Sequence, residues 1–97
     1  MPHYITSFRF TQKGVENIKQ GLSRLDAGKK AAEAVGGKLK AFYVTLGQYD
    51  GVIIAEYPND EAVAKLSLAT SALGNIRGET LRAFTEEEYR KLIASLP

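Results

Sequence analysis

The sequence predicts an α+β domain in which a β-α-β-β-α-β order forms an antiparallel, ferredoxin-like sheet with an extra C-terminal helix. Two observations predict it. Apolar residues alternate with polar ones in short strand-like segments, and they recur every three or four residues in the segments between them. Gly, Pro and Asn separate these segments. With 97 residues and 44% apolar content, we expect a single domain spanning residues 1–97.

The first half of the chain predicts a strand followed by a divided helix. In residues 3–11 the aromatic side chains alternate with other residues, as in a strand with two different faces. An apolar stripe then runs from Val15 to Val35, and Gly21 interrupts it, which predicts a short helix and a longer one. Gly36-Gly37 ends the pattern, because a helix terminus commonly needs a left-handed residue.

The second half predicts a hairpin, a helix and a last strand. Residues 38–46 and 49–57 are strand-like, and Gly47-Gln48 is the turn that joins them. Pro58 stops the second of these strands because it has no N–H for the ladder. A helix capped by Asn59 or Asp60 runs to Gly74-Asn75, and residues 76–84 form the fourth strand.

The last segment predicts an amphipathic helix with a defined start. Thr85 is the expected N-cap, and Glu88 is placed to reach back to it in a capping box. The helix then carries an apolar stripe, formed by Tyr89, Leu92, Ile93 and Leu96.

Apolar side chains on both faces of the strands predict self-association. Val52 and Ile54 point to one side of the sheet, whereas Ile53 and Ala55 point to the other. Two long helices cover only one face, so the last helix or a second subunit has to cover the other. An exposed apolar face of that size is unusual in a monomer. We therefore expect a homodimer or a higher homo-oligomer.

Composition argues against several classes of partner and cofactor. The chain has no cysteine, and its single histidine, His3, has no second ligand at metal-binding spacing, so we expect no metal and no cofactor. A net charge of +2 is too small to indicate a nucleic-acid partner. There is no signal-peptide pattern and no apolar run near the ~20 residues of a membrane span, so a cytoplasmic protein without membrane contact is the default.

Weak catalytic candidates follow from the expected topology. In the strand order 4-1-3-2 we expect strands one and three to be parallel neighbours, which places His3 and Tyr4 beside Tyr49 and Asp50. The antiparallel fourth strand brings Arg82 to the same end. Asp50 then either faces a cavity with His3 and Arg82, or pairs with a neighbouring strand, or faces its own backbone and holds its turn; of these we expect its own backbone.

Weak ligand-binding candidates are mostly aromatic. Buried tyrosines carry a hydroxyl that needs a partner, so several of them could line an amphipathic cavity, although packing alone also explains them. Asn75 and Arg77 are polar groups that we expect near Arg9 and Tyr57, at the end of the sheet away from Asp50. The candidates are Tyr4, Tyr43, Tyr49, Asn75 and Arg77.

The segments Gly47-Gln48-Tyr49-Asp50, Leu73–Arg77 and Glu79–Thr85 resemble the GYD domain family, named for its Gly-x-Tyr-Asp segment. The likeness covers nearly the whole chain and departs at Gly78, where the family usually has threonine. The resemblance implies a ferredoxin-like fold of the dimeric α/β-barrel group, a bacterial or archaeal cytoplasmic origin, and no established activity.

Three functional hypotheses remain open from the sequence. The first is a small homo-oligomeric module that binds a small organic ligand in a sensor or accessory role. The second is a cofactor-independent monooxygenase or isomerase for an aromatic or enolisable molecule, with Asp50 or His3 as base and Arg82 holding an oxyanion. The third is a purely structural assembly subunit. Whether the protein is an enzyme is not decided by its residues.

Overall fold

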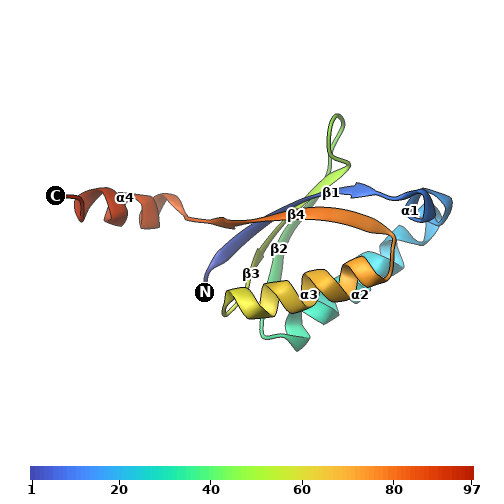
Figure 1. Cartoon of the computed structure of the whole chain (residues 1–97), viewed down its shortest axis with the longest axis horizontal. Coiled ribbons are helices and arrows are strands. Elements are labelled where there is room, and N and C mark those ends of the chain that lie inside the picture. Colours follow the sequence, from blue (N-terminus) through green and yellow to red (C-terminus); the bar gives the residue numbers. More distant parts are fainter.

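The computed structural model describes residues 1–97 as one four-stranded antiparallel sheet with two long helices on one of its faces (Figure 1). The strand order is β2-β3-β1-β4. The elements are β1 (His3–Phe10), α1 (Gln12–Glu16), the 3₁₀ turn η1 (Ile18–Gln20), α2 (Gly21–Ala34), β2 (Lys38–Val44), β3 (Gly51–Glu56), α3 (Asp60–Ala72), β4 (Ile76–Ala83) and α4 (Glu86–Ala94).

The central strands β1 and β3 are antiparallel, so the predicted parallel pairing is wrong. His3 lies opposite Glu56, and Phe8 lies opposite Gly51. The reason is topological: β2 and β3 form a hairpin and must run in opposite directions, whereas the helical crossover makes β1 and β2 parallel. A strand between β1 and β2 therefore opposes both. The predicted strand order is confirmed.

The divided helix after β1 is confirmed in outline. Thr11 is the N-cap of α1, and its side chain accepts a hydrogen bond from the Gly14 N–H. The helix breaks at Asn17 and resumes as α2 at Gly21. The outer surface of this region exposes Leu22, which is 78% accessible, so the first half of the predicted apolar stripe does not pack on the sheet.

The helices end where glycine was expected to end them. Gly36 after α2 has φ of 82°, and Gly74 after α3 has φ of 78°. Both angles lie in the left-handed region that costs an L side chain energy but costs glycine little. These two residues fix where the chain leaves the helices and enters β2 and β4.

The core lies between the helices and the inner face of the sheet, and it is small. Only eight of 97 residues are buried, which is few for a chain of this length and leaves much apolar surface in contact with water. The main cluster is Tyr4, Ala32, Ala55, Tyr57 and Val63.

The other face of the sheet has no helix over it (Figure 1). We call this surface the open face; the alternation along each strand places Ile5, Val52, Ile54 and Leu81 on it. The last helix, α4, does not fold over it. Instead α4 continues beyond the end of β4 and projects away from the body of the molecule (Figure 1).

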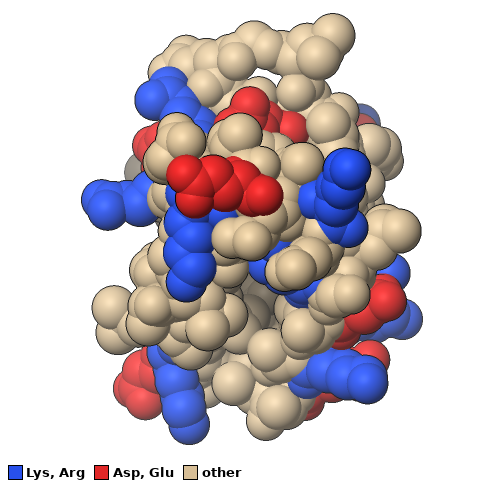
Figure 2. All heavy atoms as spheres, turned by 90° about the vertical axis from the view of Figure 1, so that its right-hand side faces the viewer, with Lys and Arg blue, Asp and Glu red and all other residues tan.

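Basic and acidic side chains are interspersed on the end of the molecule seen in Figure 2, so no single sign of charge dominates that view. The uppermost part of the same view carries no charged side chain. It corresponds to the β2–β3 hairpin, the highest part of the chain in Figure 1. The residues of its turn, 45–49, are all uncharged.

Candidate functional site

A groove of about 330 Å³ lies between α3 and the edge strand β4, on the helix side of the sheet. This volume falls at the lower end of the range for small-molecule sites. The groove is open on one side, and it combines an aromatic ring, small apolar side chains, hydroxyls and a charge of each sign. Its lining residues are Tyr4, Asp60, Val63, Ala64, Ser67, Thr80 and Arg82.

The register of β1 with β4 brings the sheet residues of the groove together. Tyr4 is opposite Arg82, and Thr6 is opposite Thr80. Because side chains two apart in a strand share a face, all of them point toward the helices. The hydroxyl oxygens of Thr6 and Thr80 are 2.8 Å apart and share a hydrogen bond. Thus β4 supplies a hydroxyl and a guanidinium to the same wall.

A hydrogen bond from Tyr4 to Asp60 joins the sheet to the start of α3. Asn59 caps this helix by accepting from the Ala62 N–H at 2.9 Å, which leaves the Asp60 carboxylate in the first turn free for another donor. The Tyr4 hydroxyl donates to it. This bond to a carboxylate raises the pKa of Tyr4, burial adds to the rise, and Arg82 opposes it. Tyr4 therefore serves as a hydrogen-bond donor and not as a base.

Arg82 is the one basic residue that lines the groove. Its guanidinium carbon lies 5.8 Å from the Tyr4 ring centre and 4.4 Å from that of Phe84. The same side chain donates to the Ala83 carbonyl and approaches Glu88 of α4, with Nη2 to Oε2 at 3.8 Å. Since a guanidinium carries five donors, Arg82 keeps capacity for a carboxylate or another anionic oxygen in the groove.

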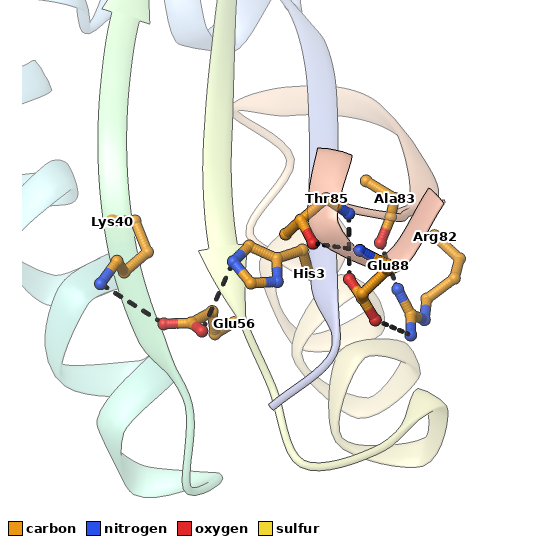
Figure 3. Close-up of polar contacts among 7 residues, drawn as sticks. All are labelled: His3, Lys40, Glu56, Arg82, Ala83, Thr85 and Glu88. Atoms are coloured by element: carbon orange, nitrogen blue, oxygen red, sulfur yellow. Dashed lines mark hydrogen bonds and ion pairs between the residues drawn. The ribbon is translucent and has the colours of Figure 1, made fainter. Parts of the chain in front are cut away.

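His3 belongs to a different polar cluster, on the open face (Figure 3). Its Nε2 lies 3.5 Å from one oxygen of Glu56, and the Lys40 ammonium lies 3.5 Å from the other. Figure 3 shows His3 between Glu56 and Glu88. The buried Nδ1 atom of His3 has no hydrogen-bond partner.

His3 and Arg82 lie at the same end of the sheet, as predicted, because His3 is opposite Ala83. They nevertheless point to opposite faces, since neighbours in a strand alternate. Glu88 is the group between them: the Thr85 N–H lowers its pKa, burial opposes this, and the charges of Arg82 and His3 lower it further. The two candidates therefore do not line one cavity.

Tyr49 and Asp50 lie at the far end of the sheet, so the predicted grouping of Asp50 with His3 and Arg82 is wrong. Asp50 is beside Phe8 and Phe10: its N–H donates to the Phe8 carbonyl at 2.8 Å, and its carboxylate accepts from the Phe10 N–H at 2.9 Å. Phe8 lies five positions after His3 along β1, a span of roughly 17 Å. The antiparallel register is the reason for this separation.

The remaining ligand candidates lie near that far end. Tyr49 donates to Glu79 at 2.7 Å; this bond raises the pKa of Tyr49, and the Arg9 guanidinium lies 5.2 Å from its ring centre. Tyr43 is 56% exposed on β2. These tyrosines are solvent-facing and do not enter the groove.

Asn75 and Arg77 occupy the start of β4. Arg77 lies opposite Arg9, as predicted, and the Asn75 carbonyl accepts from the Thr11 N–H at 3.1 Å. The prediction that Asn75 and Arg77 lie near Tyr57 is wrong, because the Tyr57 N–H donates to the Pro2 carbonyl at the other end of the sheet. Asp50 and Arg77 are therefore at the same end, contrary to the prediction.

Two further findings concern metal binding and membrane crossing. No group of three or more His, Cys, Asp or Glu side chains is arranged to hold a metal ion. No helix has both the length and the apolar character needed to cross a membrane.

Comparison with known families assigns the chain. The model of the GYD domain family matches residues 4–93, which is nearly the whole sequence. Of the four strands, only the first residue of β1, His3, lies outside the match. The chain belongs to the GYD domain family. No curated protein matched it. Within this GYD domain the segment at 47–50 forms the β2–β3 turn, where Gly47 has φ of 120° and Asp50 bonds to β1.

Sequence reasoning found Tyr4 and Arg82 but missed the groove that holds them. Asp60 was interpreted as a cap, and Ser67 and Thr80 were not singled out. The pattern that could have indicated the groove is the alternation of side chains along the strands. Tyr4, Thr80 and Arg82 lie on the same face of the sheet only when β1 and β4 pair in the observed register. Asp60 then joins them because β3 delivers the start of α3 to the same end.

Proposed function

We propose that this GYD domain is a homo-oligomeric module that binds a small organic ligand in the groove between α3 and β4, in a sensor or accessory role. The observation that carries the proposal is the pairing of Arg82 with the Tyr4–Asp60 hydrogen bond on one wall of that groove. Arg82 supplies a cation, Tyr4 an aromatic face, and Val63 an apolar floor. This combination suits a compact amphipathic molecule that carries a carboxylate or a similar anionic oxygen.

The enzymatic alternative draws less support from the geometry. It needs a base beside an oxyanion-holding group, and the register separates Asp50 from Arg82 by most of the length of β1. In the groove, the Tyr4 pKa is raised, so a tyrosinate base is disfavoured there. Binding without turnover is the simpler use of these residues.

Thermal-shift screening with a panel of small organic acids tests the ligand proposal. A ligand at about 100 times its Kd stabilises the folded state by about 2.7 kcal/mol, which raises Tm by on the order of 10 °C in a chain of this size. We expect Arg82→Gln to abolish the shift by removing the cation. Ala64→Trp should abolish it by filling the groove.

Arg90→Gln is the matched control, because Arg90 is an exposed arginine of α4 that pairs with Glu86 and does not line the groove. This variant should keep the full shift. If no acid in the panel stabilises the protein, or if Arg82→Gln shifts as much as the original chain, ligand binding in this groove is ruled out.

The homo-oligomer rests on the small core and the open face. Only eight residues are buried, and the helices cover one face of the sheet. A second copy that packs its own open face against the open face of the first would give the dimeric α/β barrel expected from the family resemblance. Light scattering at micromolar concentration should give a mass of at least twice 10.6 kDa. A mass of 10.6 kDa would contradict the oligomer without touching the ligand proposal.

A further inference from the structure

The apolar stripe of α4 has no partner within the chain. Figure 1 shows the helix projecting past the end of β4. Its residues recur at positions that share one side of a helix. Tyr89 is 59% exposed, Leu92 49% and Ile93 50%, and Leu96, just beyond the end of the helix, is 65% exposed, so about half of each side chain meets water.

The connection to β4 keeps α4 away from its own sheet. Only Phe84 and Thr85 separate the two elements. Thr85 is extended, with ψ of 166°, and the capping box fixes it: its side chain accepts from the Glu88 N–H at 3.1 Å, and its own N–H donates to the Glu88 carboxylate at 2.9 Å. These bonds fix the start of the helix, and the extended backbone at Thr85 carries α4 past the end of β4 and away from the open face (Figure 1). The partner of the stripe is therefore outside this copy of the chain.

The β2–β3 hairpin is a second unpartnered apolar projection. Leu46 at its tip is fully exposed at 100%, and Val44 is 70% exposed. Two bonds hold the tip in shape: the Thr45 hydroxyl donates to the Tyr49 carbonyl at 2.7 Å, and Arg9 Nε donates to the Gln48 carbonyl at 2.6 Å. The hairpin rises on the side of the sheet away from α2 and α3 (Figure 1), and its uncharged surface stands out in Figure 2.

Hairpin and α4 leave the sheet at opposite ends. The last residue of β4, Ala83, is opposite His3 at the beginning of β1, whereas the hairpin returns to the sheet at Gly51, opposite Phe8. A two-fold axis that sets two open faces together with reversed strand direction therefore brings each hairpin tip to the end of the sheet from which α4 of the other copy projects. Such an arrangement is self-complementary, as a closed dimer requires.

We propose that the tip of the β2–β3 hairpin, Val44 and Leu46, docks on the apolar stripe of α4 in a second copy of this chain, twice per dimer. Charge favours the same occupant: the tip is uncharged, and the exposed charges beside the stripe pair within α4, Glu86 with Arg90 and Glu87 with Lys91.

The exposed area is also sufficient for a dimer. Each half-exposed aromatic or aliphatic side chain offers on the order of 100 Å², so stripe, tip and open face together approach the roughly 800 Å² per partner of a stable interface. The inference rests on the proposed homo-oligomer and adds to it the contact between α4 and the hairpin.

Cysteine cross-linking tests this contact, because the chain contains no cysteine that would interfere. In the double variant Leu46→Cys, Leu92→Cys, mild oxidation or a short bismaleimide should give a covalent dimer on a denaturing gel. A mixture of the two single variants should give the same band, which shows that the link joins different copies. The control pair Leu68→Cys, Leu92→Cys places one thiol on the exposed outer surface of α3, where Leu68 is 73% accessible, and should stay monomeric on the gel.

Affinity gives a second readout. We expect Leu46→Asp or Leu92→Asp to weaken dimerisation on the order of a hundred- to ten-thousandfold, because each substitution removes a buried leucine from both contacts of the dimer. Leu22→Asp, on the exposed surface of α2, should leave it unchanged. A dimer by light scattering that neither cross-links nor responds to Leu46→Asp overturns the hairpin–α4 contact and leaves the oligomer in place. A monomer overturns both.

Discussion

The carboxylate of Asp50 accepts a hydrogen bond from the backbone N–H of Phe10 at 2.9 Å, and this bond ties the β2–β3 turn to the end of β1. The aspartate of the Gly-x-Tyr-Asp segment thus serves the backbone of a neighbouring strand. The Asp50 N–H donates to the Phe8 carbonyl, so both ends of the residue hold the same strand.

Replacing Asp50 should lower the free energy of unfolding, and the size of the loss should depend on whether the new side chain still offers an acceptor oxygen to the Phe10 N–H. Asp50→Ala leaves the Phe10 N–H without its partner and should lower the free energy of unfolding by about 1.5–3 kcal/mol, the range for a hydrogen bond to a charged group. Asp50→Asn keeps a carbonyl oxygen and should cost less. Denaturant unfolding measures both; equal losses would mean that the charge of Asp50, and not its acceptor oxygen, matters.

The Tyr4–Asp60 bond should appear in an alkaline titration. The folded pKa of Tyr4 is raised above its ordinary value of 10.0, chiefly by the bond to Asp60. The resulting stabilisation is complete below pH 10 and is lost as pH rises through the folded pKa. Ultraviolet absorbance of phenolate should show Tyr4 ionising late, and Asp60→Asn should bring its pKa back toward the ordinary value. An unchanged titration in that variant would contradict the assigned cause.

Loss of the N-cap should act locally on α4. Thr85→Ala removes the acceptor for the Glu88 N–H and should destabilise the helix by about 1 kcal/mol. Because α4 projects from the body, the change should appear as faster amide hydrogen exchange in Glu86–Ala94 with little change elsewhere. Thr85→Ser retains the oxygen and is the control. Equal exchange in Thr85→Ala and the original chain would show that the cap contributes nothing.

Acid should loosen the same helix start. The pKa of Glu88 is lowered, first by the hydrogen bond from the Thr85 N–H. Its contribution is present above the ordinary glutamate pKa of 4.5 and is lost as pH falls through the lowered folded pKa. Exchange in the first turn of α4 should therefore rise in this acidic range. Glu88→Gln should remove the pH dependence, and a dependence that persists would have to come from another group.

Two glycines of the first helical region should respond in opposite directions to alanine. At Gly14 an added Cβ would lie 2.0 Å from the Asn75 carbonyl oxygen, so Gly14→Ala must push apart the packing of α1 on the start of β4 and should destabilise by several kcal/mol. At Gly21 nothing lies within 4 Å, so Gly21→Ala should stabilise by about 0.4–1 kcal/mol. Thermal unfolding of the two variants compares them directly, and equal effects would contradict the close approach at Gly14.

The order of the elements could be predicted because each has a local signal. The capping box of Thr85 and Glu88 and the glycines that end α2 and α3 appear where the sequence places them. These features depend on neighbours within a few residues. A single sequence carries them completely.

The relative placement of distant residues could not be predicted as well. Register and strand direction decide that Asp50 meets Phe10 and that Tyr4 meets Arg82, and an error in the direction of β3 moved Asp50 to the wrong end. The groove follows from that register together with the start of α3. Alternation along the strands indicated an uncovered face but could not show that α4 points away from it.

The capping box of α4 also bears on how association would be driven. A free helix of nine residues is marginal in water, and a segment that orders only when it binds gives up about 2–5 kcal/mol of its interaction energy. Here the first turn is already held by Thr85, Glu88 and Arg82 in the single chain. The helix therefore meets a partner with its first turn already ordered, and the conformational entropy of that turn is lost when the chain folds and not when it associates.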